Sequence, residues 1–323
     1  MLVDNYGRVI DYLRVSVTDR CNLRCLYCFP HGEVCYVPHE DLLRYEEILR
    51  LTDLFVGLGI RKIRVTGGEP LLRKNILFLL ERLLKQENLR EVGLTTNGLL
   101  LGENAEAIKR AGIGRVNVSI DTLRPDVFEK LTGSDMLRRV VESIKEARRV
   151  GLSVKLNVVA MRGINDGEYR DFIDFAVRHG CDIRFIEIMP QAHPDLFASE
   201  RYISSREILS ALAKGYRLQA LTIAGSGAKE RLFTIEGQSL RIGFISPISD
   251  PFCAHCNRLR LTSDGMLKSC LYSRDAVNLR DLLRRGGSDA EIQTAVVEAV
   301  KAKPESHQIG CGRISLDMHR TGG

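Results

Sequence analysis

The chain has 323 residues, of which 44% are hydrophobic and 27% charged, and its formal net charge is +6 at pH 7. This composition is typical of a globular protein with one large domain, alone or with a smaller one. No run of about twenty apolar residues occurs and the first residues do not resemble a signal peptide, so we expect a cytoplasmic protein without a membrane span. The mild charge and the absence of tryptophan argue against binding to nucleic acid.

Strand-like and helix-like segments alternate between residues 13 and 188. Short β-type apolar runs predict strands at residues 13–17, 62–66, 92–95, 115–120, 154–160 and 183–188. Apolar residues that recur every three or four positions predict helices at residues 42–58, 76–84, 103–111, 137–144 and 172–177. Such alternation predicts an α/β fold with parallel strands and crossover helices.

The pattern changes near residue 216. Short strands are expected at residues 232–235, 240–244 and 258–261, and helices at residues 277–284 and 290–302. We therefore predict a first domain at residues 1–215 and a smaller C-terminal α+β domain at residues 216–323.

Three cysteines follow the first strand at CxxxCxxC spacing: Cys21, Cys25 and Cys28, here called the first triad. An iron–sulfur cubane normally has four thiolate ligands, so three would leave one iron open for a substrate or cosubstrate. The alternative is a structural zinc site with His31 or Cys35 as the fourth ligand. Three ligands within eight residues differ from most zinc ribbons, and this favours the cluster.

A second group of thiols consists of Cys253, Cys256 and Cys270, here called the second triad. The bare motif slightly favours zinc, completed by His255 or a distant histidine, and a second cubane with an open iron is the alternative. The nine cysteines thus form two triads and three single residues, which indicates metal binding in a reducing compartment rather than a disulfide framework.

Polar residues gather where the predicted strands end, as in Gly67–Pro70, Thr95, Ser119 and Met189. In barrels of parallel strands the chemistry collects at these carboxyl ends. No phosphate loop of the GxxxxGK[ST] type occurs, so a phosphorylated substrate would be bound by arginine and lysine. Arg258 and Arg260 alternate on one strand and point to one face.

The first triad, with Gly-Gly-Glu-Pro some forty residues later, resembles the radical S-adenosylmethionine (SAM) superfamily. The resemblance implies a partial (β/α)6 TIM-type barrel and a [4Fe-4S] cluster on the first triad, whose open iron binds SAM. The SAM contacts that it implies are Tyr27, Gly68, Glu69, Ser119 and Met189.

Longer strings are similar to the GTP 3′,8-cyclases of molybdenum cofactor biosynthesis, over nearly the whole chain. They include Thr18–Asn22, Lys62–Pro70, Lys155–Val159, Gly243–Ile248, Phe252–Thr262 and the terminal Gly322-Gly323. This resemblance implies a second [4Fe-4S] cluster on the second triad, in contact with the guanine base. The GTP-binding residues that it implies are Arg14, Lys62, Arg64, Thr95, Lys155, Arg258 and Arg260, and Arg14 and Arg64 join the first triad as catalytic residues.

The implied enzyme is a lyase that cleaves SAM reductively and uses the resulting 5′-deoxyadenosyl radical to remove the 3′ hydrogen of GTP. The ribosyl radical then attacks C8 of guanine, and reduction gives 3′,8-cyclo-7,8-dihydro-GTP. The resemblance also implies an external electron donor and cyclic pyranopterin monophosphate synthase as the next enzyme, and it allows a homodimer.

The chain departs from this family at Phe29, where methionine is usual, in residues 224–231, and at Thr321, where isoleucine is usual. We expect the Gly-Gly tail to reach into the active site, and Cys35, Cys181 and Cys311 to be structural or incidental. Two rival functions are another radical SAM enzyme with an auxiliary cluster, such as a peptide-modifying one, and a zinc-containing nucleic acid binding protein.

Overall fold

The computed structural model describes all residues except 30–33, 190–199, 222–230, 274, 308–317 and 323. Eight of the described strands pair in parallel: β3 (Tyr12–Ser16), β4 (Lys62–Thr66), β5 (Glu91–Thr96), β6 (Arg115–Ser119), β7 (Ser153–Ala160), β8 (Asp182–Glu187), β11 (Arg241–Ile245) and β12 (Arg258–Leu261). Antiparallel strands extend them: β9 (Leu218–Leu221), β10 (Arg231–Ile235), β13 (Met266–Lys268) and β14 (Val277–Asn278). The strand order is β14-β13-β12-β3-β4-β5-β6-β7-β8-β11-β10-β9. A separate hairpin pairs β1 (Leu2–Val3) with β2 (Val9–Ile10).

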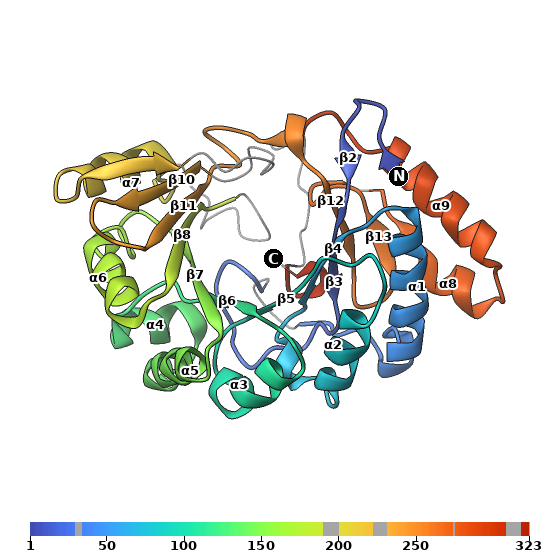
Figure 1. The fold of residues 1–323 in the computed structure, drawn as a ribbon, viewed down its shortest axis with the longest axis horizontal. Coiled ribbons are helices and arrows are strands. Elements are labelled where there is room, and N and C mark those ends of the chain that lie inside the picture. The colour runs from blue at the N-terminus through green and yellow to red at the C-terminus, as the bar shows by residue number, and fades with distance from the viewer. Residues whose placement is uncertain (30–33, 190–199, 222–230, 274, 308–317, 323) are drawn as a thin grey trace.

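Nine helices of the described residues cover the outside of this curved sheet (Figure 1). They are α1 (Tyr45–Leu58), α2 (Ile76–Leu84), α3 (Leu101–Arg110), α4 (Pro125–Thr132), α5 (Leu137–Arg149), α6 (Tyr169–His179), α7 (Ser205–Ala213), α8 (Leu279–Arg284) and α9 (Asp289–Lys301). A tenth helix, α10 (Met318–Thr321), follows them in the chain. Three short 3₁₀ turns are η1 (His39–Asp41), η2 (Pro70–Leu72) and η3 (Cys253–His255). Helix α1 shows why they pack: Ile48, Leu51 and Phe55, at helical spacing, are fully buried. Each such side chain contributes about 1.5–3 kcal/mol when it leaves water.

The parallel strands curve into an open barrel, and the last helix, α10, lies inside the ring of strands (Figure 1). The six expected strand–helix units are present, so the predicted partial TIM-type barrel is confirmed. The order of the sheet also shows how the C-terminal part is attached. Strand β12 pairs with β3 and β11 pairs with β8, so segments after residue 240 extend both edges of the barrel.

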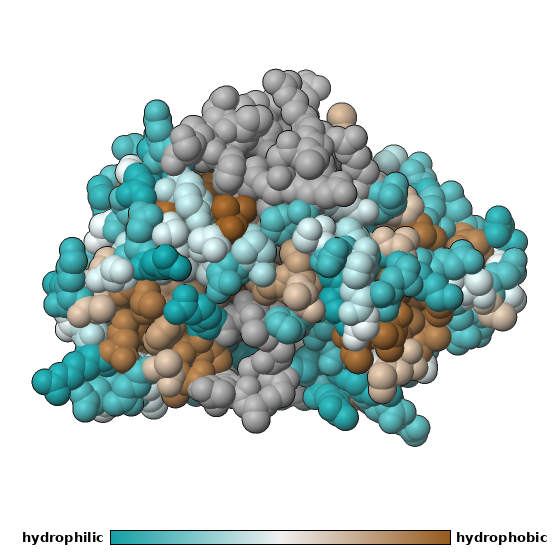
Figure 2. Space-filling model, turned by 90° about the horizontal axis from the view of Figure 1, so that it is seen from above, coloured by the Kyte–Doolittle hydropathy of each residue, from teal (hydrophilic) through white to brown (hydrophobic). Residues whose placement is uncertain are grey.

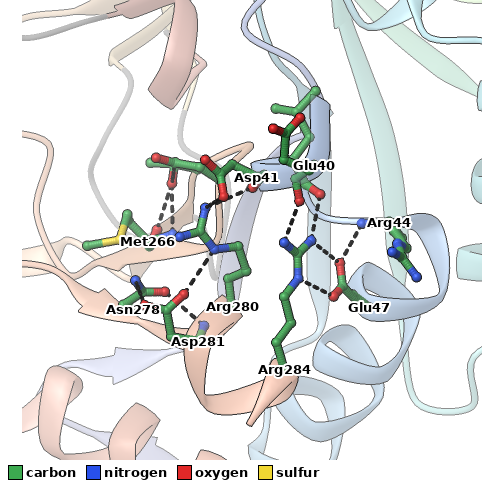
Figure 3. A network of polar contacts seen from close by, with 12 residues as sticks. Glu40, Asp41, Arg44, Glu47, Met266, Asn278, Arg280, Asp281 and Arg284 are labelled. Atoms are coloured by element: carbon green, nitrogen blue, oxygen red, sulfur yellow. Dashed lines mark hydrogen bonds and ion pairs between the residues drawn. The ribbon is translucent and has the colours of Figure 1, made fainter. Parts of the chain in front are cut away.

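A polar network joins the C-terminal helix α8 to the start of the chain (Figure 3). Arg284 donates to the Glu47 carboxylate at 2.8 and 3.0 Å and to the carbonyl of Leu42 at 2.9 Å. Arg280 pairs with Asp41 at 3.0 Å. The C-terminal part is therefore fastened to the barrel, and the division at residue 215 stays a prediction.

Some elements differ from the sequence-based expectations. The apolar pattern at residues 277–284 predicts a helix, but Val277–Asn278 forms an edge strand and the helix begins at Leu279. Asn278 caps that helix, because its side chain accepts the backbone N–H of Asp281. Helices α4 and α7, of eight and nine residues, were not expected, since such short segments show little periodicity.

On the face shown in Figure 2, hydrophilic residues are most frequent and hydrophobic ones gather in separate patches. Among the described residues, each helix is too short or too polar to cross a bilayer.

Candidate active site

The first triad lies on the loop that follows strand β3. The side chain of Asn97 donates to Cys21 Sγ at 3.6 Å. Backbone hydrogen bonds from Arg24 and Leu26 fasten the loop to helix α4. Burial raises the pKa of Cys25, and the other two thiols of the triad raise it further. The three sulfurs therefore lie close enough to act as ligands of one group.

The second triad lies on two loops beside strands β12 and β13. Cys253 begins the 3₁₀ turn η3, Cys256 follows it as the C-cap, and Cys270 follows β13. Burial raises the pKa of Cys253, and the other two thiols of this triad raise it as well. The buried guanidinium of Arg8 donates to the carbonyl of Cys253 at 2.8 Å and holds the loop in place. The pairing of β12 with β13 brings the two loops of this triad to neighbouring positions.

The chemistry of both donor sets fits an iron–sulfur cluster. Each of the six cysteines lies outside any disulfide bond. In the described part of the chain, no group of three His, Cys, Asp or Glu side chains is arranged to hold a single metal ion. His31, one of the fourth ligands expected for the zinc alternative, lies outside the described residues. Cysteine binds such clusters as the thiolate, and a bound cluster supplies the positive charge that buried thiolates need. Cys35 and Cys181 are free as well, and Cys311 lies outside the described residues.

The first triad opens into a cavity, and the second triad is connected to it through an apolar cluster. A cavity of about 450 Å³ is lined by the whole first triad. Cys28 and Cys270, one from each triad, pack against the same apolar cluster of Leu271, Tyr272 and Met318. A ligand in the cavity would therefore lie between the two thiol groups.

Strand register assembles a group of cations on one wall of the cavity, here called the basic cluster: Arg14, Lys62, Arg64, Arg258 and Arg260. Arg260, Arg14 and Arg64 occupy neighbouring positions on β12, β3 and β4. Arg258 and Lys62 flank Tyr12 two residues earlier on the same strands. Residues in register on parallel strands face the same side, and all six line the cavity.

The basic cluster is suited to an anion. Burial lowers the pKa of Arg14 to about 9, and the nearby Arg260 lowers it as well. Burial also lowers the pKa of Arg260 to about 10. Both shifts show that the charged guanidinium groups are held at a cost, which a bound polyphosphate would offset. Glu91 neutralises the far end of the cluster, where it pairs with Arg64 at 3.2 Å and Lys62 at 3.7 Å.

A glycine makes room for one of these cations. Gly93 is the register neighbour of Arg64 on β5. A Cβ atom at Gly93 would lie 2.2 Å from one terminal nitrogen of Arg64 and 2.4 Å from its central carbon. The missing side chain therefore allows the guanidinium to lie flat against the sheet.

The Gly-Gly-Glu-Pro turn follows β4 and packs tightly on the segment before the first triad. A Cβ at Gly68 would lie 2.3 Å from the carbonyl oxygen of Arg20. Glu69 is fully buried, and its carboxylate accepts the backbone N–H groups of Asn97 (2.7 Å) and Leu71 (3.0 Å). Burial raises the pKa of Glu69 to about 7. Gly68 lines the cavity, whereas Glu69 supports the loop after β5 from behind.

The other predicted SAM contacts lie around the first triad. Tyr27, Ser119 and Met189 line the cavity. The Tyr27 hydroxyl donates to Asp121 at 2.6 Å, and the same carboxylate accepts the backbone N–H of Val159 at 2.8 Å. Burial raises the pKa of Asp121 to about 6. Tyr27 is thus held in place by a buried carboxyl group that the sequence analysis did not single out.

The remaining predicted nucleotide contacts are Thr95 and Lys155. The Thr95 hydroxyl lines the cavity and has no hydrogen-bond partner within the described part of the chain, as expected for a group that contacts a ligand. Lys155 is buried and is the register neighbour of Asn117, which lines the cavity.

The C-terminal tail enters the same chamber. The carbonyl of Gly322 accepts hydrogen bonds from Arg260 (2.9 Å) and Arg14 (3.3 Å). The ring of His319 stacks on Phe29, with centroids 4.7 Å apart. Arg320 pairs with Asp264 at 3.0 Å. Gly323 lies outside the described residues, as does most of the divergent 224–231 segment.

Sequence reasoning missed several lining residues, among them Tyr12, Asn117, Asn157 and Arg184. Tyr12 precedes Arg14 by two positions, Asn117 precedes Ser119 by two, and Asn157 follows Lys155 by two. Alternate residues of a strand point to the same face. If the prediction had included the residue two positions before or after each predicted residue on the same strand, it would have found these three.

Comparisons with known proteins match nearly the whole chain. A family model described as Radical SAM superfamily matches residues 15–176, and one described as Molybdenum Cofactor Synthesis C matches residues 181–309. The GTP 3′,8-cyclase of Peptoclostridium acidaminophilum is 45% identical over 326 aligned residues, which cover 100% of this chain and 98% of that protein. The cyclase of Desulforamulus reducens is 43% identical and covers 96% of each chain.

Among solved structures, Streptococcus suis SuiB is similar in fold, with a TM-score of 0.63 at 15% identity over 84% of this chain and 64% of SuiB. The S-adenosylmethionine-bound form of SuiB gives a TM-score of 0.60 at 16% identity over 88% of this chain and 68% of SuiB. At such low identity these structures show the fold alone.

Proposed function

Because this chain belongs to the GTP 3′,8-cyclase family of radical SAM enzymes, we propose that its cavity binds SAM against the first triad and GTP between the basic cluster and the second triad. The family confirms the function predicted from the motifs, a radical SAM GTP 3′,8-cyclase of molybdenum cofactor synthesis. The peptide-modifying and zinc-containing alternatives are set aside, because the cyclases match along nearly the whole chain.

The observation that carries the proposal is the single cavity that the first triad and the basic cluster share, with Cys270 of the second triad packed against Met318, which lines that cavity. The first triad would hold a [4Fe-4S] cluster with SAM, which would supply the radical that removes the 3′ hydrogen of the GTP ribose. The C3′ radical would add to C8 of guanine, and one electron from the external donor with one proton from solvent would complete the product. The basic cluster neutralises the triphosphate, since arginine matches phosphate oxygens in bidentate geometry. The apolar cluster of Leu271, Tyr272 and Met318 keeps water from the space between the triads.

We assign the SAM contacts to Tyr27, Gly68, Ser119 and Met189. Glu69 has a positioning role, because its buried carboxylate holds the loop after β5 in place. The GTP contacts are Thr95, Lys155 and the basic cluster, in which Arg14 and Arg64 act in catalysis. We further propose two [4Fe-4S] clusters, lyase chemistry, an external electron donor and the 1–215 and 216–323 division into domains. Transfer of the product to cyclic pyranopterin monophosphate synthase, a cytoplasmic location and a homodimer complete the proposal.

Anaerobic incubation of the reconstituted protein with SAM, a reductant and GTP tests the proposal. We expect 5′-deoxyadenosine and a cyclised nucleotide in equal amounts, and about eight irons per chain. ATP serves as the control nucleotide and should give no cyclised product. Formation of 5′-deoxyadenosine without any cyclised guanine nucleotide would contradict the proposal.

The contact between Gly93 and Arg64 gives a sharper prediction. Gly93→Ala places a Cβ against the guanidinium, which is the mobile end of a side chain, so the fold should survive while Arg64 moves. Loss of one hydrogen bond to a charged group costs about 1.5–3 kcal/mol, so KM for GTP should rise by about tenfold to a hundredfold. The control is Gly114→Ala, because no atom lies within 4 Å of a Cβ there. Equal KM values for the two variants would refute this role of Gly93.

A further inference from the structure

Tyr12 occupies the centre of the basic cluster, although it carries no positive charge. It lies between Arg258 and Lys62 in one register row, directly before the row of Arg260, Arg14 and Arg64. Its side chain lines the cavity. Among the described residues of this wall, Tyr12 is a phenol surrounded by cations.

The contacts of Tyr12 involve two of the cluster arginines. Arg64 Nε donates to the Tyr12 hydroxyl at 3.3 Å. The Arg258 guanidinium lies over the Tyr12 ring, 5.9 Å from its centroid. The buried Nε of Arg258 has no hydrogen-bond acceptor among the residues that the structure describes. Tyr12 therefore holds both arginines while leaving Arg258 able to donate to a ligand.

Positively charged groups outnumber negatively charged ones around the phenol. The titratable and charged groups that face it are Asp11 and Arg14 on its own chain segment, Lys62 and Arg64 on β4, Glu91 on β5, and Arg258 and Arg260 on β12. Five cations thus outnumber two carboxylates, one of which, Glu91, already pairs with Arg64, Lys62 and Arg115. Burial opposes ionisation of Tyr12, but Arg64, Arg14 and Arg258 overcome it and lower its pKa to about 7.

We propose that the Tyr12 oxygen is the internal counter-ion of the basic cluster in the nucleotide-free protein, and that it takes up a proton from solvent when the triphosphate of GTP binds. The inference rests on the proposed function, because it requires a polyphosphate at this wall. The phosphate oxygens replace the phenolate of Tyr12 as partners of the arginines. The phenolate then takes up one proton, which removes its repulsion from the triphosphate.

The sign of the resulting pH dependence follows from linkage. Neutralisation of the arginines by phosphate raises the pKa of Tyr12 in the complex above its value of about 7 in the free protein. Binding then takes up protons at any pH between the two values, so affinity falls as the pH rises above 7. Below about pH 6 the phenol is already protonated, and the coupling disappears.

Titration calorimetry of GTP binding to the reconstituted enzyme, in buffers of different ionisation enthalpy, counts these protons. The variant is Tyr12→Phe, which keeps the ring beneath Arg258 and removes only the hydroxyl. The control is Tyr6→Phe, an exposed tyrosine of the N-terminal hairpin loop. At pH 7 the wild type and Tyr6→Phe should take up about half a proton more per GTP than Tyr12→Phe, because a group of pKa about 7 is half ionised there.

The affinity for GTP gives a second readout, expressed as the ratio of the association constants of the wild type and Tyr12→Phe. Between pH 6 and pH 8 the wild-type affinity should fall about tenfold relative to that of Tyr12→Phe, because the protonated fraction of Tyr12 falls by that factor. Ionisation of the γ-phosphate affects both proteins alike and cancels in the ratio. A purely structural role of Tyr12 would weaken binding equally at each pH.

Equal proton counts in wild type and Tyr12→Phe, with GTP still bound, would overturn this inference and leave the proposed function standing. Failure of the wild type to bind GTP at any pH would overturn both. If Tyr12→Phe does not fold, the wild type alone decides, since an affinity that does not fall between pH 7 and pH 8.5 also refutes the inference.

Discussion

Cys256→Ala should leave reductive cleavage of SAM intact and abolish the cyclised nucleotide. Cys256 belongs to the second triad, whereas the first triad lies on a separate loop after β3 with its own support from helix α4. Loss of one of three thiolates should release the second cluster, so that iron falls from about eight to about four per chain. Without its guanine contact, GTP is no longer held beside the radical, and turnover should drop by at least about a hundredfold.

The matched variant is Cys25→Ala in the first triad. It should also lose about four irons, but it should lose 5′-deoxyadenosine formation as well, because SAM then has no open iron. Cys35→Ala is the control, since Cys35 is an exposed free thiol outside both triads. Iron analysis with product chromatography separates the three proteins. An unchanged iron content in Cys256→Ala would show that the second triad holds no cluster.

Local sequence patterns were sufficient to predict the alternating strands and helices, because each unit pairs a short apolar strand with a helical stripe such as Ile48, Leu51 and Phe55. The partial barrel was implied by the family resemblance, and the pairing of later strands with its edges could not be predicted from local patterns. Strand β12 follows β8 by some seventy residues and yet pairs with β3 at the other edge. Such long-range register depends on the packing of the whole sheet and leaves no local signal.

The same distinction applies to the site. The triads and the basic residues are chemically conspicuous, so Cys21, Arg14 and Arg260 could be named from spacing and family resemblance. Tyr12 and Gly93 could not, because their role arises only from their register neighbours Arg258, Lys62 and Arg64. The stack of His319 on Phe29 joins residues 290 positions apart, and only the docked tail brings the two rings together.

Deletion of Gly322 and Gly323 should reduce cyclisation by about a hundredfold or more while iron content and melting temperature stay near the wild-type values. The carbonyl of Gly322 accepts hydrogen bonds from Arg260 and Arg14, and both arginines belong to the wall proposed to bind the triphosphate. Two hydrogen bonds from charged donors contribute about 3–6 kcal/mol in total. Helix α10 keeps its own anchors through Met318 and the Arg320–Asp264 pair, so the deletion should affect the position of the two arginines more than the stability of the fold.

A point substitution keeps the tail and tests whether the position of the Gly322 carbonyl matters. Gly322 has φ +66°, and a Cβ there would lie 2.2 Å from Cγ2 of Thr66. Gly322→Ala should therefore displace the carbonyl, and Gly322→Ala with Thr66→Ala should regain part of the activity because the methyl group is gone. Gly286→Ala is the control, since Gly286 has φ +80° and open space around it. Equal turnover of Gly322→Ala and Gly286→Ala would show that the position of the carbonyl between Arg14 and Arg260 does not matter for turnover.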